Sequence, residues 1–227
     1  MTPKHTQGIV LTRTNFSESD RIVTLLTNKF GKIKVIAKGV RKERSRLAGG
    51  IELFSISEIG FIQGRGELDT LVSARLIKHY DQFLGDLEKV NFAYECLKNI
   101  NRITADAADE QYFILLETLF DALNDRSLDL VVINIWWVLR FLNLTGHTIN
   151  LQSIVGGESF TDNQKYIFDS EHGGFVINKN GTIKADHIKY LRLAMSSDSH
   201  TLSRVKNGQK LATDLLPYLR GFIELVH

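Results

Sequence analysis

The chain has 227 residues, 43% of them hydrophobic and 24% charged, which is typical of a globular protein with one large domain or two modest ones. The net charge of +2 divides unevenly: residues 1–80 carry 14 basic and 7 acidic side chains, a net of +7, and residues 81–227 carry 14 basic and 19 acidic, a net of −5. A single cysteine excludes an intramolecular disulfide and a cysteine-based zinc site.

Short segments with strand character fill residues 1–80. They are rich in β-branched and aromatic residues and are separated by turn signals such as Gln63–Gly66. Five such segments in a compact basic unit predict a closed barrel of the oligonucleotide/oligosaccharide-binding (OB) type, although an SH3-like barrel fits the same pattern. We expect the strands at Gly8–Thr14, Asp20–Asn28, Lys32–Lys38, Ile51–Ile62 and Asp69–Ile77.

The segment Lys29–Arg46 holds eight basic residues and one acid, Glu43. Its first half alternates apolar and basic residues, which predicts a half-buried strand with a positive outer face. Its second half, Gly39–Gly50, is poor in apolar residues and contains three glycines, which predicts a flexible basic loop. Lys and Arg bind phosphate backbones by releasing condensed counterions, and the charge of residues 1–80 agrees with such a role. The residues expected to contact nucleic acid are Lys32, Lys34, Lys38, Arg41, Lys42, Arg44, Arg46 and Arg65.

Other residues of this half have simpler interpretations. Glu18 and Asp20 are two apart, but beside Arg21 they fit turn chemistry and ion pairing better than a metal site. Aromatic platforms for stacking bases are sparse, and each candidate is expected to pack inside the barrel. These candidates are Phe16, Phe30, Phe54 and Phe61.

From about Asp86 the hydrophobic period changes to steps of three and four residues, which predicts helices. The first two helices are expected over Leu87–Ile103 and Tyr112–Leu123. Cys96 lies on the first of them and is expected to be an inert, packed thiol. Ser127 is the expected N-cap of a third helix, which is apolar nearly all round and which Gly146 ends. Further helices are expected near Ala185–Met195 and Gly208–Val226.

Residues 150–181 interrupt the helical pattern. Glycine pairs alternate there with the β-like pieces YIFD and GFVI, which predicts a small insert with a hairpin. The whole chain is therefore predicted to be an α+β protein of two domains. Residues 1–80 form an OB-fold nucleic-acid-binding domain, and residues 81–227 form a helical domain with an insert at about 150–181.

Nothing in the sequence indicates an enzyme. No Ser/His/Asp arrangement, no phosphate-cradling GxxxxGK[ST] and no HExxH occurs. The N-terminal residues lack the apolar core of a signal peptide, and Leu128–Leu144 is too short and too polar to span a bilayer. We therefore expect a cytoplasmic protein without catalytic activity.

Several short blocks near the N-terminus carry a resemblance to a known family. They are Gly8–Leu11, Glu18–Val23, Thr27 with Gly31-Lys32, Ala37–Lys42, Ser45-Arg46 and Gly64–Leu68. In these blocks the chain resembles the bacterial recombination mediator family RecO, most firmly over the first eighty residues. The resemblance implies an OB-fold and a helical domain, binding of single- and double-stranded DNA, annealing of complementary strands and loading of the RecA recombinase. It also implies RecR and the C-terminal tail of single-strand-binding protein as partners, and a nucleoid-associated location.

The insert departs from the family pattern. Many members carry a four-cysteine zinc site there, whereas the corresponding positions of this chain hold Ser153 with Gly156 and Val176 with Lys179. We therefore expect no metal and no other cofactor. The insert should instead be held by the packing of Tyr166, Phe168, Phe175 and Val176.

An acidic, aromatic protein tail needs an apolar pocket ringed by basic side chains. We expect Arg140, Lys189 and Arg192 at the rim of such a pocket, and Trp136 and Trp137 in the core. Two other functions fit the basic barrel: an RNA-binding OB factor, and a protein adaptor whose positive charge serves only solubility.

Overall fold

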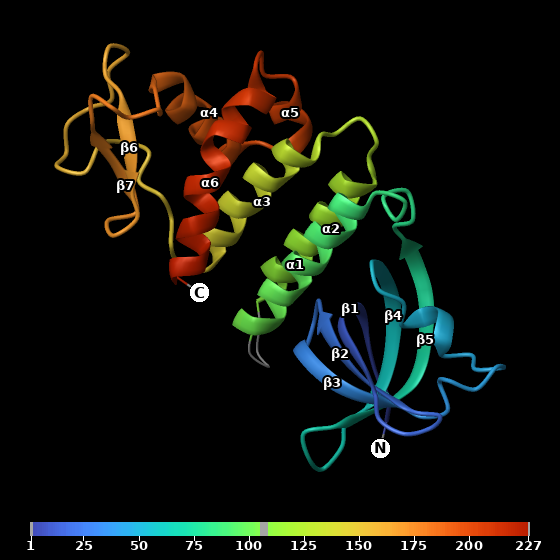
Figure 1. Ribbon diagram of the computed structural model, residues 1–227. Coiled ribbons are helices and arrows are strands. Elements are labelled where there is room, and N and C mark those ends of the chain that lie inside the picture. The colour runs from blue at the N-terminus through green and yellow to red at the C-terminus, as the bar shows by residue number, and fades with distance from the viewer. Residues whose placement is uncertain (1, 105–108, 227) are drawn as a thin grey trace. The chain divides into compact units, whose positions relative to one another are not determined.

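The computed structural model describes residues 2–104 and 109–226 (Figure 1). By their internal contacts, the residues group into two compact units, Met1–Asn124 and Asp125–His227. Within the described residues, no helix is both long enough and apolar enough to cross a membrane.

The first unit contains a closed barrel of five strands, and its connectivity identifies the barrel type. β3 pairs in parallel with β5, and β4 returns to pair with β1, so the order around the barrel is β1-β2-β3-β5-β4. An SH3-like meander would pair β3 with β4, whereas this order is that of an OB-fold. The OB prediction is therefore confirmed. The strands are β1 (Lys4–Asn15), β2 (Arg21–Thr27), β3 (Gly31–Ala37), β4 (Ser55–Ile62) and β5 (Asp69–His79).

The barrel encloses a continuous apolar core. Val23 with Leu25 on β2, and Val35 with Ala37 on β3, are fully buried at alternate positions, as the period of two requires. The core consists of Val10, Val23, Leu25, Val35, Ala37, Val40, Ile51, Ile59, Phe61 and Leu71.

The segment before β4 differs from the prediction. β4 begins at Ser55, whereas a strand was expected from Ile51. The preceding residues form the short 3-10 helix η1 (Ala48–Gly50) and a turn that buries Ile51 and Phe54. Gly50 packs so closely on β5 that a Cβ atom there would lie 2.5 Å from Ala74. The apolar run therefore packs against the barrel as an irregular segment, which periodicity alone does not distinguish from a strand.

Two helices, α1 (Leu87–Ile103) and α2 (Glu110–Asn124), belong to the same compact unit as the barrel. The Phe54 ring lies 5.0 Å from that of Tyr94 on α1 and 5.8 Å from that of Phe120 on α2, measured between centroids. Lys78 on β5 also pairs with Asp121 on α2. The compact units therefore differ in extent from the predicted domains 1–80 and 81–227, which follow the change of secondary structure. The Cys96 thiol is buried on α1.

The second unit is helical around α3 (Leu130–Leu144), which packs against the other helices of this unit. In Figure 1, α3 and α6 run side by side. Trp136 and Trp137 are both buried on α3, as predicted. The remaining helices are α4 (Ala185–Ser196), α5 (Ser199–Ser203) and α6 (Gly208–Val226), and α5 is an addition to the predicted set.

The ends of α3 test the capping predictions. Its N-cap is Asp129, whose Oδ1 accepts a hydrogen bond from the Val131 N–H at 3.0 Å, so the prediction of Ser127 is wrong. Asp and Ser are about equally good N-caps, and only the position of the first helical turn selects between them. Gly146 follows the helix with a φ of +82°, which confirms the predicted stop.

The insert contains the expected hairpin. Its strands, β6 (Tyr166–Asp169) and β7 (Gly174–Ile177), pair antiparallel and coincide with the YIFD and GFVI segments. These two segments had been expected from their aromatic and β-branched content and from the glycines between them.

Candidate nucleic-acid interface

Strand β3 contributes both to the barrel core and to its basic outer face. Val35 and Ala37 are fully buried, and Ile33 packs against the core. Lys34 is exposed, since alternate side chains of a strand point to opposite faces. The predicted alternation is confirmed, and Lys38 continues the exposed row just after the strand ends.

Lys32 lies on the outer face of β3 but has a partner within its own unit. Its Nζ donates a hydrogen bond to the backbone carbonyl of Asn101 at 2.9 Å. Asn101 lies in the last turn of α1, where carbonyl groups lack intrahelical partners and carry partial negative charge. Lys32 thus joins β3 to the end of α1, and its predicted contact with DNA stays a prediction.

A carboxylate anchors the basic loop that follows β3. The Asp20 Oδ1 accepts hydrogen bonds from the Gly39 N–H at 2.7 Å and from the Ser19 hydroxyl at 3.1 Å. The Gly39 bond is the main cause that holds the pKa of Asp20 below its ordinary value of 3.8. Gly39 has a φ of +65°, which a residue with a side chain would adopt only with strain. The role of Asp20 in turn chemistry is confirmed.

Arg41 ties the same loop to the β1–β2 turn. Its N–H donates to the Ser19 carbonyl at 3.0 Å, and its Nη1 donates to the Ser17 carbonyl at 2.9 Å. The loop is therefore fastened at its start, against the prediction that the whole of Gly39–Gly50 is flexible. Arg41 remains exposed despite these bonds.

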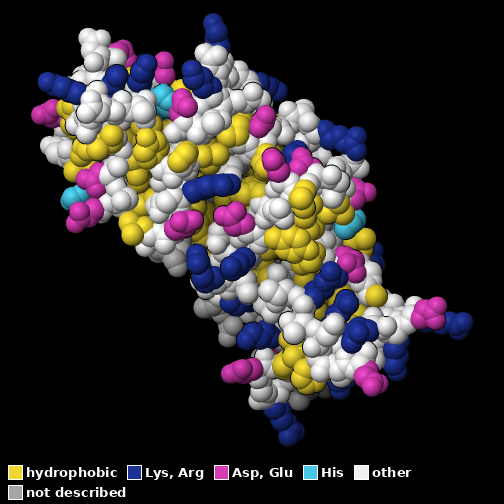
Figure 2. All heavy atoms as spheres, in the orientation of Figure 1, with side chains coloured by type: hydrophobic (Ala, Val, Ile, Leu, Met, Phe, Trp, Pro, Cys, Tyr) yellow, Lys and Arg dark blue, Asp and Glu magenta, His cyan; other side chains and the backbone are white. Residues whose placement is uncertain are grey.

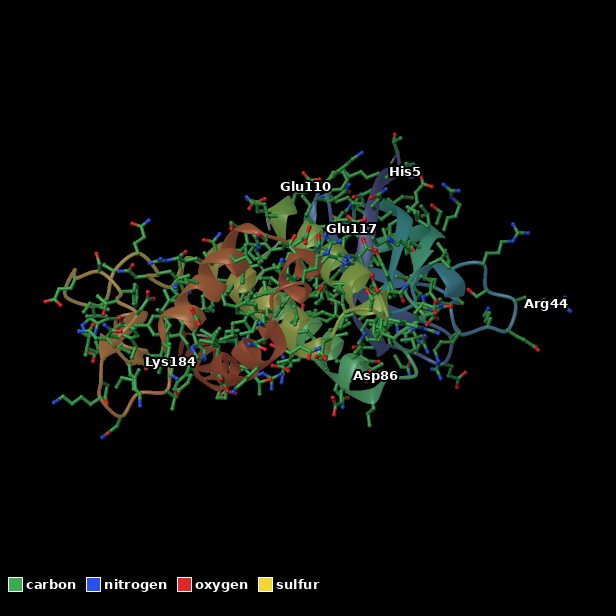
Figure 3. All side chains as sticks on the ribbon, turned by 90° about the horizontal axis from the view of Figure 1, so that it is seen from above. His5, Arg44, Asp86, Glu110, Glu117 and Lys184 are labelled. Atoms are coloured by element: carbon green, nitrogen blue, oxygen red, sulfur yellow. The ribbon has the colours of Figure 1, made fainter. Side chains whose placement is uncertain are left out.

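The outer part of the loop presents its cations to solvent. Lys42, Arg44 and Arg46 are all exposed. Figure 3 shows Arg44 at the outer end of the loop, pointing away from the barrel strands. In Figure 2, Lys and Arg side chains are spread over the barrel, and an acidic side chain stands beside a basic one at the end of the loop. Such a surface can bind phosphates without reading base sequence.

Arg65 lies apart from this loop, in the exposed turn between β4 and β5. The Asp69 carboxylate fixes this turn by accepting the Gly64 N–H at 2.9 Å. A hollow of about 420 Å³ lies between the turn and β3. Lys34 lines it, together with Lys4, whose Nζ is 5.2 Å from the centroid of the Phe30 ring.

Lys4 is a candidate that the sequence did not reveal. It is an isolated cation near the N-terminus, and only the pairing of β1 with β4 brings it opposite Phe61. No local pattern signals such a long-range neighbour. Of the four aromatic candidates, Phe54 and Phe61 are buried and Phe30 packs on the core, as expected, whereas Phe16 is exposed.

The three residues predicted at a pocket rim in the second unit each have a partner within that unit. The Arg140 Nη2 donates to the Ser197 carbonyl at 3.1 Å, and the Arg192 Nε donates to the Leu151 carbonyl at 2.7 Å. Lys189 is paired with Asp162 at 3.1 Å.

Lys189 also lines a hollow of about 330 Å³ with a partly apolar wall. Lys206 stands at the same hollow, and Tyr190 lies in its wall. Burial raises the pKa of Tyr190 to about 12, so its hydroxyl is neutral at physiological pH. The hollow is completed by Asp186, Leu193, Val205, Asn207 and Leu211.

Comparison with known proteins finds two family models that together cover most of the chain. Residues 1–80 match the family model described as "Recombination protein O N terminal", and residues 86–226 match "Recombination protein O C terminal". The chain belongs to the RecO family. Both of its domains are accounted for by this family, which agrees with the barrel and the helices of the structure.

Curated relatives of this RecO-family chain carry the name "DNA repair protein RecO". The protein of Heliobacterium modesticaldum is 30% identical over 96% of this chain and 82% of its own length. That of Dehalococcoides mccartyi is 26% identical over the whole chain and 92% of its own length. That of Desulfatibacillum aliphaticivorans is 31% identical over 82% of the chain and 74% of its own length.

The insert of this RecO-family chain does not fit a thiolate zinc site. Residues 150–181 contain no cysteine and one histidine, His172, whose Nδ1 is 2.9 Å from the Asp169 carboxylate. Among residues 2–104 and 109–226, no three His, Cys, Asp or Glu side chains come together as a metal site. Aromatic rings fill the insert instead: Phe175 lies 5.3 Å from Phe168 and 6.2 Å from Phe160, measured between centroids.

We expect the insert to be stable without metal. A chelator should leave the thermal unfolding midpoint unchanged, whereas Phe175→Ala should cost about 3–5 kcal/mol of unfolding free energy, as measured in urea by tryptophan fluorescence. Ile177→Ala is the matched control, because Ile177 lies on the same strand and is 42% exposed. A lower midpoint in chelator would contradict this expectation.

We also expect the Asp20 carboxylate to hold the basic loop in place. Asp20→Ala should make trypsin cleave several times faster between Lys38 and Arg46, as identified by mass spectrometry. Glu18→Ala removes the same charge from the same turn and should have no effect, since Glu18 is exposed. Because the pKa of Asp20 is lowered, the tether persists at neutral pH and is lost only as the pH falls below 3.8. Equal cleavage of the two variants would contradict the tether.

Proposed function

We propose that this chain is a non-catalytic DNA-binding mediator of recombinational repair. It anneals complementary strands and helps to load the RecA recombinase onto DNA coated with single-strand-binding protein. Family membership and the names of the curated relatives support a repair role. The observation that carries the proposal is the basic loop Gly39–Gly50, which Asp20 and Arg41 fasten to an OB barrel and which presents exposed Lys and Arg side chains.

The chemistry of this surface suits annealing. Flexible Lys and Arg side chains neutralise phosphates of any sequence, and their affinity for a strand falls as the salt concentration rises. Two complementary strands held on one cationic surface repel each other less, so base pairing between them becomes more favourable. This mechanism requires no catalytic group and no cofactor.

The proposed partners are RecR and the C-terminal tail of single-strand-binding protein. The hollow beside α4 supports the second of these, since it combines the apolar Leu193, Val205 and Leu211 with Lys189 and Lys206. An acidic tail that ends in apolar residues fits such a combination. Arg140 and Arg192 bind backbone carbonyls of their own unit, so we assign them a supporting role.

Charge reversal of the loop tests DNA binding. Arg41, Lys42, Arg44 and Arg46 changed together to Glu should abolish most of the affinity for single-stranded DNA. The loss of four phosphate contacts should also reduce the slope of log affinity against log salt by about 3. Fluorescence anisotropy over a salt series measures both quantities.

The matched control reverses four exposed cations of the other unit: Arg126, Lys165, Lys179 and Lys210. It gives the same net charge and should retain most of the affinity. Equal losses in the two variants would show that the loop has no special role. Tighter binding of wild-type protein to RNA than to DNA of the same sequence would favour an RNA-binding factor instead.

Annealing in the presence of single-strand-binding protein tests the mediator role. We expect the chain to accelerate annealing of complementary strands coated with the full-length protein, and much less so when the coat lacks its C-terminal tail. Lys206→Glu should weaken this dependence on the tail, whereas Lys210→Glu, an exposed change nearby in the sequence, should not. Annealing that is indifferent to the tail would exclude the proposed tail contact.

A further inference from the structure

The β1–β2 turn carries an aromatic ring that the barrel does not use. The chain has thirteen phenylalanines, all within the described residues, and Phe16 is the only exposed one, at 60%. The side chain lies on the turn to which the basic loop is fastened. Exposure of so much apolar surface is unfavourable in water, so a ligand that covers the ring would gain the corresponding free energy.

Hydrogen bonds order the backbone of the turn that carries Phe16. Its N–H donates to the Asp20 carbonyl at 3.1 Å, and the Asp20 N–H donates to the Ser17 hydroxyl at 3.1 Å. The Arg21 Nε donates to the Asn15 side chain at 3.1 Å. Because the turn is already ordered, binding of a ligand to the ring costs little backbone entropy.

Two arginines bind the residues that precede and follow Phe16 in the sequence. The residue before Phe16 accepts a hydrogen bond from Arg21, and the residue after it accepts one from Arg41. Lys38 is close enough to Asp20 to contribute to the lowered pKa of that carboxyl. An apolar ring between cations matches a nucleotide, which joins a flat base to an anionic phosphate.

We propose that Phe16 is a stacking platform for an unpaired base of single-stranded DNA, with Arg21 and Arg41 next to the flanking phosphates. The proposal rests on the DNA-binding function proposed above and deepens it. Stacking on a π-face is tolerant of sequence, whereas bases within a duplex already cover their faces with each other. Phe16 therefore adds a preference for single strands to a loop that binds any phosphate backbone.

Variants at this position test the stacking role without disturbing the core, since the ring is exposed. Binding is compared for a thymidine 12-mer, an abasic 12-mer with the same phosphates, and a duplex. Phe16→Ala should lower affinity for the thymidine strand by about tenfold and leave the abasic strand and the duplex within about twofold. Phe16→Trp should retain or raise the affinity for thymidine, and Phe16→Leu should behave like Phe16→Ala although it keeps apolar surface.

Leu87→Ala is the matched control, because Leu87 is a 73% exposed apolar residue of the same unit on α1, and it should change none of these affinities. Thymidine affinity that is unchanged by Phe16→Ala, or an equal loss for the abasic strand, would overturn the stacking role. If the wild-type chain binds none of the oligonucleotides, both this proposal and the DNA-binding function fail. Loop-dependent binding that is indifferent to Phe16 removes this proposal alone.

Discussion

The Asp20 carboxylate makes the interaction on which the arrangement of the basic surface depends. It accepts the Gly39 N–H and so joins two segments that lie nineteen residues apart at one end of the β2–β3 hairpin. Together with the two hydrogen bonds of Arg41, it fastens the start of the loop, and a fastened loop loses less entropy on binding a phosphate backbone than a free segment would. One acidic residue thus orders a group of basic residues. A count of charges records this acid only as a reduction of the net positive charge.

Much of the fold is readable from local pattern, because each element carries its own period and its own end signals. The alternation along β3 assigns its two faces correctly, since one face must be apolar to fill the barrel. The hairpin of the insert is placed correctly because aromatic runs are bounded by glycines. The stop at Gly146 depends on a left-handed backbone that glycine adopts without strain.

The remaining features depend on neighbours that are remote in sequence. Lys32 has the character of a surface cation, but the end of α1 supplies it with a carbonyl partner. The 51–54 segment is apolar enough for a strand, yet it packs irregularly beside η1. A phenylalanine is expected to pack in the core, and only the geometry of the β1–β2 turn exposes the Phe16 ring to solvent. Charge patterns locate the candidate interface, whereas the contacts that shape it arise from the tertiary structure.

The two tryptophans, Trp136 and Trp137, both lie in one of the two compact units. Both are buried on α3, so their emission reports the packing of the unit Asp125–His227. An unfolding curve recorded by direct tryptophan emission therefore uses probes in the unit Asp125–His227 alone. An indole introduced at position 16 would be the sole tryptophan of the unit Met1–Asn124, so the difference between the emission of this variant and that of the wild type would report on that unit.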